Sequence, residues 1–104
     1  QEPLWEDQVY LDEVTHTVWI LGKPTQLLTA QEYRLFKMLY KRKNEVISKD
    51  ELVEAGWPNS KGGVSDEALM VTVSRMRKKI EPDPENPRII ENVREHGYRL
   101  NSDI

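Results

Sequence analysis

The sequence of 104 residues contains no cysteine, so it offers no disulfide, no thiolate metal site and no cysteine nucleophile. It has only two histidines, His16 and His96, and neither an HExxH spacing nor a glycine-rich phosphate loop. We therefore expect no enzyme activity, no metal site and no cofactor. Long apolar runs and a basic-then-apolar leader are also lacking, which excludes a membrane span or secretory signal in this fragment and predicts a cytoplasmic setting without membrane contact.

Positive charge is scarce too, because 15 Lys and Arg face 18 Asp and Glu, for a net charge of −3. Taken alone, this balance argues against a domain that holds nucleic acid electrostatically. The acidic excess lies at the front, since residues 1–30 carry a net charge of −4 while residues 61–104 are neutral. Four cations fall within residues 75–79, so an anion-binding surface is expected after residue 70.

The length and the 38% hydrophobic content predict a single domain over residues 1–104. Short apolar stretches separated by turn-formers such as Gly22-Lys23-Pro24 predict an antiparallel sheet within residues 4–28, with Val14 and Leu27 among its apolar positions. Residues 29–80 then read as three helices. Capping boxes starting at Thr29 and Ser48 open the first two.

Ser65 followed by two acids predicts the start of the third helix, which should run to about Ile80, where three prolines follow in residues 82–87. Two strand-like runs within residues 88–100 flank Arg94-Glu95-His96-Gly97 and predict a hairpin, with Gly97 in the left-handed turn position. The predicted fold class is therefore α+β.

The third helix has two distinct faces. A core-facing stripe is formed by apolar residues at helical spacing, namely Leu69, Val73, Met76 and Ile80. The opposite face carries Glu67, Val71, Ser74, Arg75 and Lys78. A helix that enters the DNA major groove uses apolar groups against thymine methyls and Arg against guanine, which would explain the outward Val71. On periodicity alone, an amphipathic helix with one stray surface valine explains the pattern equally well.

A short helix, a turn, a longer helix with outward cations and an Arg-tipped hairpin make the layout of a winged helix-turn-helix. From Leu28 to Leu100 the sequence resembles the C-terminal effector domain of OmpR/PhoB-type transcriptional regulators. The resemblance rests on LLTAQEYRLFKMLYKRKNEVISKDEL, Trp57, VTVSRMRKKIEPDPENPR and IIENVREHGYRL. It implies a winged helix with an N-terminal antiparallel sheet of four strands, a three-helix core and a C-terminal wing.

The resemblance also implies roles for individual residues in sequence-specific binding of double-stranded DNA by a response regulator of a two-component system. Bases would be read by Thr72, Arg75 and the wing residue Arg94, and the helix face adds Val71 and Glu67. Phosphates would be contacted or bordered by Trp57, Ser74, Arg77, Lys78, Asn92 and Tyr98. Of these, Trp57 and Tyr98 are also expected to fill space in the core or hinge, and Arg77 to lie along the core.

The same resemblance implies a homodimer on direct-repeat DNA and contact of loop 57–64 with RNA polymerase, although a plain surface loop would account for that segment as well. Two residues depart from the family pattern, since Glu67 stands where many members have a basic residue and Glu95 replaces the small residue usual at the wing tip. Phosphate would repel an acid at position 67. Glu67 could instead accept a hydrogen bond from cytosine or complement the helix N-terminus. The alternative function is a winged-helix protein-interaction module with little affinity for DNA.

Overall fold

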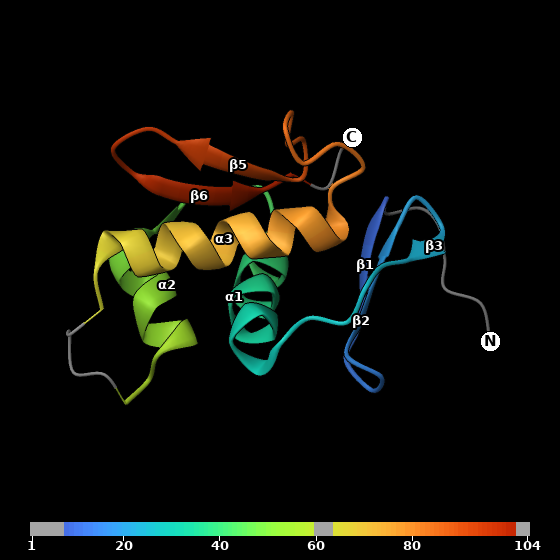
Figure 1. Cartoon of the computed structure of the whole chain (residues 1–104), viewed down its shortest axis with the longest axis horizontal. Coiled ribbons are helices and arrows are strands. Elements are labelled where there is room, and N and C mark those ends of the chain that lie inside the picture. Colours follow the sequence, from blue (N-terminus) through green and yellow to red (C-terminus); the bar gives the residue numbers. More distant parts are fainter. Residues whose placement is uncertain (1–7, 60–63, 102–104) are drawn as a thin grey trace.

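The computed structural model describes residues 8–59 and 64–101. In chain order, its elements are β1 (Val9–Asp12), β2 (Thr17–Ile20), β3 (Lys23–Pro24), α1 (Ala30–Lys41), β4 (Ile47–Ser48), α2 (Lys49–Gly56), α3 (Asp66–Ile80), β5 (Ile90–Val93) and β6 (Gly97–Leu100). Figure 1 shows α3 crossing α1 and α2, with the β5–β6 hairpin along its side and the first sheet beyond its C-terminal end. The arrangement is a winged helix, as the sequence predicts.

Two antiparallel sheets of three strands each are present in the described ranges, with strand orders β1-β2-β3 and β4-β6-β5. An N-terminal antiparallel sheet is thus confirmed from residue 9 onward, but with three strands among the described residues rather than the four that the resemblance implies. Residues 4–7 of its expected range lie outside the described residues. Lys23 and Pro24, expected in a turn, pair with Ile20 and Trp19 instead. Val14, expected on a strand, lies in the β1–β2 turn with 93% of its surface exposed, and Leu27 also lies exposed outside any strand.

The three helices begin where their capping residues predict. Thr29 accepts a hydrogen bond from the backbone N–H of Glu32, and the Glu32 carboxylate accepts one from the N–H of Thr29, so the first capping box is complete. Ser48 likewise accepts the N–H of Glu51, but the Glu51 carboxylate pairs with Arg42. This ion pair links the end of α1 to the first turn of α2.

The core-facing stripe of α3 is confirmed, since Leu69, Val73, Met76 and Ile80 are all buried. They pack in one cluster with the inner faces of α1, α2 and both sheets. Burying a side chain of this size contributes about 1.5–3 kcal/mol relative to leaving it exposed. The position of α3 is therefore fixed along its whole length, which leaves the opposite face free for other contacts.

Strand β4 is not evident in the sequence, where residues 41–48 read as a tight connection between two helices. Ile47 pairs with Tyr98 and Ser48 pairs with Gly97, so β4 forms an edge of the wing sheet. Ile47 is completely buried. Because α2 follows β4 directly, the wing and the helix-turn-helix are joined through a shared backbone ladder.

Glu81 joins the end of α3 to the wing across the proline-rich segment 82–87. Its carboxylate is buried and accepts hydrogen bonds from the backbone N–H groups of Arg88 at 2.8 Å, Ile89 at 3.0 Å and Ile90 at 2.8 Å. These charge-assisted bonds satisfy the donors at the entry to β5. The proline segment ends the helix, and Glu81 fixes where the chain resumes.

Candidate nucleic-acid interface

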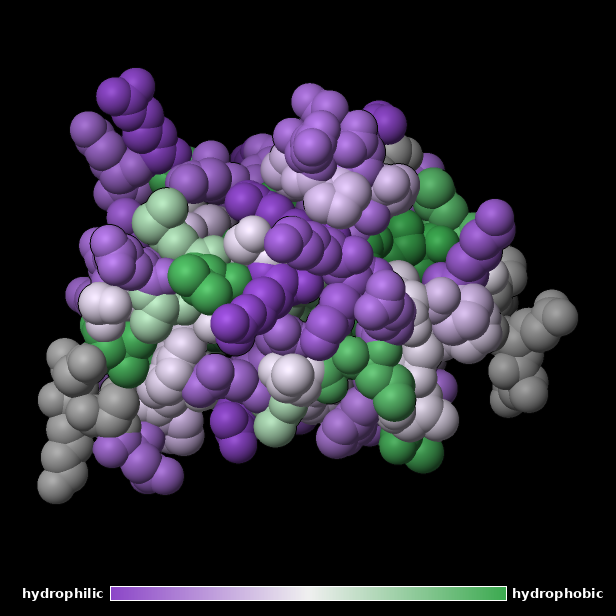
Figure 2. Space-filling model, viewed as in Figure 1, coloured by the Kyte–Doolittle hydropathy of each residue, from purple (hydrophilic) through white to green (hydrophobic). Residues whose placement is uncertain are grey.

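The exposed face of α3 lies opposite its buried stripe. It is formed by six side chains, namely Glu67, Met70, Val71, Ser74, Arg75 and Lys78. Met70 is 55% exposed and Val71 is 48% exposed. Figure 2 shows a small apolar area over the N-terminal half of α3, bordered by hydrophilic surface. Sequence reasoning did not select Met70, although it lies four residues before Ser74 and therefore shares this face.

The cations of α3 divide into two pairs. Arg75 and Lys78 are exposed and make no ion pair with any residue in the described part of the chain. Lys79 binds the buried Glu32 carboxylate at 2.7 Å, and Arg77 donates from Nε and Nη2 to the carbonyl of Ile90 at 3.2 and 2.8 Å. Only two of the four cations are therefore available to an external anion without breaking an internal contact.

Thr72 is buried, whereas reading a base would require an exposed side chain. It is only 6% exposed, and its hydroxyl donates a hydrogen bond to the carbonyl of Ala68 at 2.9 Å. A threonine in a helix interior commonly satisfies its hydroxyl this way. The Thr72 side chain is thus buried, whereas its neighbour Val71 is exposed on the outer face of α3. Thr72 is therefore not part of the candidate surface.

The wing presents Arg94 on an exposed turn. The N–H of His96 donates to the carbonyl of Val93 at 3.0 Å, and Glu95 adopts φ +69°. Glu95, rather than Gly97, therefore takes the left-handed position. This geometry corrects the expected turn.

Gly97 has a different reason to be glycine. Its φ is +152°, and a Cβ there would lie 1.9 Å from the carbonyl oxygen of Ile47. The glycine lets β4 approach β6 closely enough for the wing sheet to form.

Three predicted phosphate-contacting residues meet where α3 touches the wing. The Arg77 guanidinium lies 6.0 Å from the ring centroid of Tyr98, and Tyr98 is buried. Burial raises the pKa of Tyr98 above its usual value of 10.0 despite the nearby Arg77 charge. Asn92 pairs with Tyr98 across the sheet and therefore shares its face, but is exposed. Arg77 and Tyr98 thus hold the wing on α3, and Asn92 is the exposed member of the group.

Glu32 and Lys79 fix α3 against α1. Burial raises the pKa of Glu32, but hydrogen bonds from Lys79 and Thr29 outweigh this effect, and the net pKa lies below its ordinary value of 4.5. The carboxylate is therefore ionised at neutral pH and holds the Lys79 ammonium. The pair orients the C-terminal half of α3 without using its exposed face.

The segment that follows α2 is only partly described. Trp57 is half-buried and packs against the core, in keeping with its expected space-filling role. Residues 60–63 of the loop 57–64, including the Gly62-Gly63 pair, lie outside the described residues. The expected polymerase contact of this loop therefore stays a prediction.

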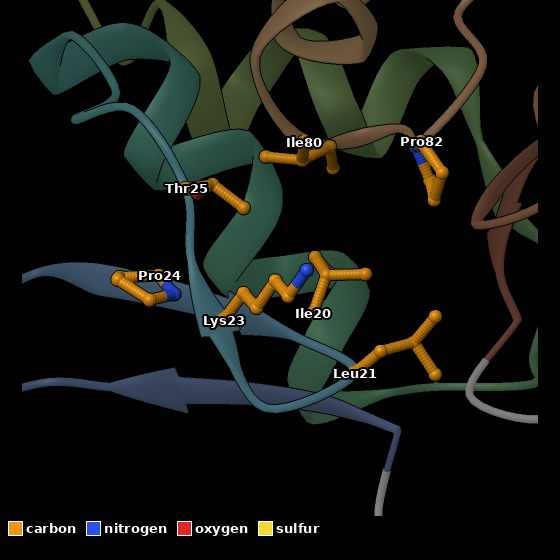
Figure 3. A pocket seen from close by; sticks show the side chains of 7 residues that line it. All are labelled: Ile20, Leu21, Lys23, Pro24, Thr25, Ile80 and Pro82. Carbon is orange, nitrogen blue, oxygen red and sulfur yellow. The ribbon is translucent and has the colours of Figure 1, made fainter.

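A cavity of about 280 Å³ lies where the first sheet meets the C-terminal end of α3. Figure 3 shows Ile80 and Pro82 on one side, facing Ile20, Leu21 and Lys23 on the other. Of the described residues that line it, only Lys23 is charged. Among the described residues, no cluster of His, Asp and Glu could hold a metal ion, and no helix is long and apolar enough to cross a bilayer.

Comparison with known proteins places this geometry in a family. The family model described as "Transcriptional regulatory protein, C terminal" matches residues 22–100. Protein PetR of Rhodobacter capsulatus is 38% identical in an alignment of 80 residues that covers 73% of this chain and 34% of that protein. The chain spans about one third of the length of the first curated relatives it matches.

Two solved structures have the same fold. The response regulator DrrB, an OmpR/PhoB homologue of Thermotoga maritima, superposes with a TM-score of 0.77 at 27% identity, covering 92% of this chain and 42% of DrrB. The DNA-binding domain of the response regulator AdeR, solved in complex with an intercistronic region, gives a TM-score of 0.74 at 26% identity, covering 92% of this chain and 95% of that domain.

Proposed function

The chain belongs to the family of C-terminal domains of transcriptional regulatory proteins, of the OmpR/PhoB type, and we propose that it binds specific double-stranded DNA sequences through α3 and the wing. The proposal places α3 in the major groove and the β5–β6 turn in the adjacent minor groove. It follows from membership of the family and from the structure of AdeR, a relative solved with an intercistronic region. The arrangement of exposed groups on this chain supports it further.

The observation that carries the proposal is the exposed face of α3. Apolar side chains at Met70 and Val71 lie one helical turn from Arg75, an exposed cation without a partner in the described chain. Major-groove edges offer the matching groups, namely thymine methyls and the O6 and N7 acceptors of guanine. A solvated helix face would gain nothing from exposed methionine and valine beside a free arginine.

The remaining contacts divide by exposure. Ser74 and Lys78 lie on this face and Asn92 is exposed on β5, and we propose that all three contact phosphates. Arg77 and Tyr98 act mainly as supports, because the Arg77 donors already hold Ile90 and Tyr98 is buried. Arg94 on the wing turn would enter the minor groove, where arginine is attracted by the negative potential.

Larger assemblies belong to the proposal as well. Relatives such as PetR are more than twice as long as this chain, and we propose that the domain acts within a response regulator of a two-component system in the cytoplasm. Binding as a homodimer to direct repeats and contact with RNA polymerase through loop 57–64 follow from the family resemblance. The low net charge of −3 supports the dimer, since one domain alone has little electrostatic affinity.

The deciding experiment selects bound duplexes from a random library and then compares variants on the selected sequence. Arg75→Ala should lose about 1–3 kcal/mol of binding free energy and relax the preference at one base pair. Arg34→Ala is the matched control, because it removes an exposed cation from α1. If Arg75→Ala discriminates selected from random duplexes as wild type does, α3 does not read bases through this residue.

Salt dependence separates the proposal from the alternative of a protein-interaction module. A DNA-binding domain should lose duplex affinity with a slope of about −0.9 in log K against log salt for each phosphate neutralised. A module that binds only proteins would show little duplex affinity even at low salt. Absence of any duplex binding at about 50 mM salt by the wild-type domain would therefore overturn the proposal.

A further inference from the structure

The tip of the wing has an unusual charge balance. Its three turn residues are Arg94, Glu95 and His96, and all three are exposed. The acid cancels the arginine, so the net charge of the tip is zero when the imidazole is neutral and +1 when it is protonated. The protonation state of His96 therefore decides whether these three turn residues together have a net positive charge.

The turn backbone holds these groups in place. The His96 N–H closes the turn on the Val93 carbonyl, and Gly97 pairs with both Val93 and Ser48. The His96 imidazole has no hydrogen bond or ion pair with any other part of the chain that the structure describes. It is therefore available to a ligand in either protonation state.

The charged groups near His96 belong to its own hairpin and to the segment that pairs with it. On its own hairpin the charged residues are Arg94 and Glu95 in the turn, and Glu91 and Arg99, which pair with each other at 2.8 Å. Ser48 of β4 pairs with Gly97, and the charged residues that follow Ser48 directly are Lys49 and Asp50 in the first turn of α2. The Lys49 ammonium lies 4.0 Å from the Asp66 carboxylate of α3. Within residues 8–59 and 64–101, no carboxylate forms an ion pair with the His96 imidazole.

We propose that His96 is a protonation-dependent contact to the DNA backbone, so that the domain takes up a proton as the wing binds. The inference rests on the proposed DNA-binding function and deepens it. Histidine changes charge between about pH 5 and 8, and neighbouring phosphates favour the charged form. Binding and protonation therefore support each other, and affinity rises as the pH falls.

The size of the effect follows from counterion release. One additional phosphate contact steepens the salt dependence by about 0.9, which at 0.1 M salt corresponds to about an eightfold gain in affinity. We expect this gain between pH 8 and pH 5.5, the range in which histidine titrates. Arg94 remains charged throughout, so it contributes to affinity at both pH values without contributing to the difference.

The test measures duplex affinity by fluorescence anisotropy with the selected, labelled sequence at both pH values and several salt concentrations. His96→Gln should bind at either pH with the affinity that wild type has at pH 8. His96→Lys should bind at both with the affinity that wild type has at pH 5.5. His16→Gln is the matched control, because this second histidine stacks on Tyr33 with ring centroids 4.1 Å apart, away from the wing.

Circular dichroism at each pH verifies that every variant is folded, and calorimetry in buffers of different ionisation enthalpy counts the protons taken up. Near pH 7, wild type and His16→Gln should take up about half a proton per domain, the most that an eightfold gain allows, whereas His96→Gln should take up none. If His96→Gln binds the duplex and keeps the wild-type pH dependence, this inference is wrong and the proposed function stands. If wild type binds no duplex at either pH, both are wrong.

Discussion

Removing the Glu81 carboxylate should destabilise the domain more than removing any exposed acid. Glu81 is only 6% exposed, and its carboxylate accepts hydrogen bonds from the backbone N–H groups of Arg88, Ile89 and Ile90. Both Ile89 and Ile90 are completely buried, so water cannot reach their donors if the carboxylate is lost. Arg88 is exposed, and water can replace that bond.

The magnitude follows from the two buried donors. An unsatisfied buried hydrogen-bonding group costs about 1–3 kcal/mol, so Glu81→Ala should lose about 2–6 kcal/mol of the free energy of unfolding. Typical domains have only about 5–15 kcal/mol in total, which makes this a large fraction. Glu81→Gln retains one oxygen acceptor but no charge, and should fall between wild type and Glu81→Ala.

Urea unfolding followed by tryptophan fluorescence measures this effect. Glu85→Ala is the matched control, because Glu85 is an exposed acid in the same proline-rich segment. It should change the unfolding free energy by less than about 0.5 kcal/mol. A loss below about 1 kcal/mol for Glu81→Ala, or one equal to that of Glu85→Ala, would refute the claim that this carboxylate joins α3 to the wing.

Three further substitutions test other contacts. Lys79→Gln should destabilise the domain by about 2 kcal/mol near pH 7. The lowered pKa of Glu32 means that this contribution is present above the ordinary value of 4.5 and is lost as the pH falls below it, so urea unfolding near pH 3 should show little difference from wild type. Gly97→Ala should cost about 3 kcal/mol in thermal or urea unfolding, because its Cβ would meet the Ile47 carbonyl oxygen. Thr72→Val should leave the selected DNA sequence unchanged in a repeated selection, whereas a new preference at any base pair would show that Thr72 reaches DNA.

Local signals in the sequence were sufficient for most of the fold. Side-chain caps at Thr29, Ser48 and Ser65 set the helix starts correctly, because each cap depends on residues only three apart. The apolar spacing of α3 identified its buried side for the same reason. These patterns involve residues within one or two helical turns of each other, so they can be recognised in the sequence without knowing which distant segments are in contact.

The missed features depend on partners far away in the chain. Ile47 and Ser48 become a strand only because β6 lies beside them, about fifty residues later. Glu81 reads as an ordinary charged residue after a helix until the fold brings β5 to it. Thr72 differs again: helical spacing places it between the two faces, and only packing decides that it is buried.

The charge of the candidate surface sets the kind of binding it can support. After Lys79 and Arg77 are engaged internally, the α3 face and wing turn offer three free cations, Arg75, Lys78 and Arg94. Even if each of these three cations neutralised one phosphate, the salt slope would be only about −2.7 per domain, so electrostatics alone cannot supply tight binding. Apolar contacts at Met70 and Val71, which release no counterions, must then provide much of the discrimination. A domain of this kind binds its target usefully only when base contacts, a second copy on the DNA, or both add to the phosphate term.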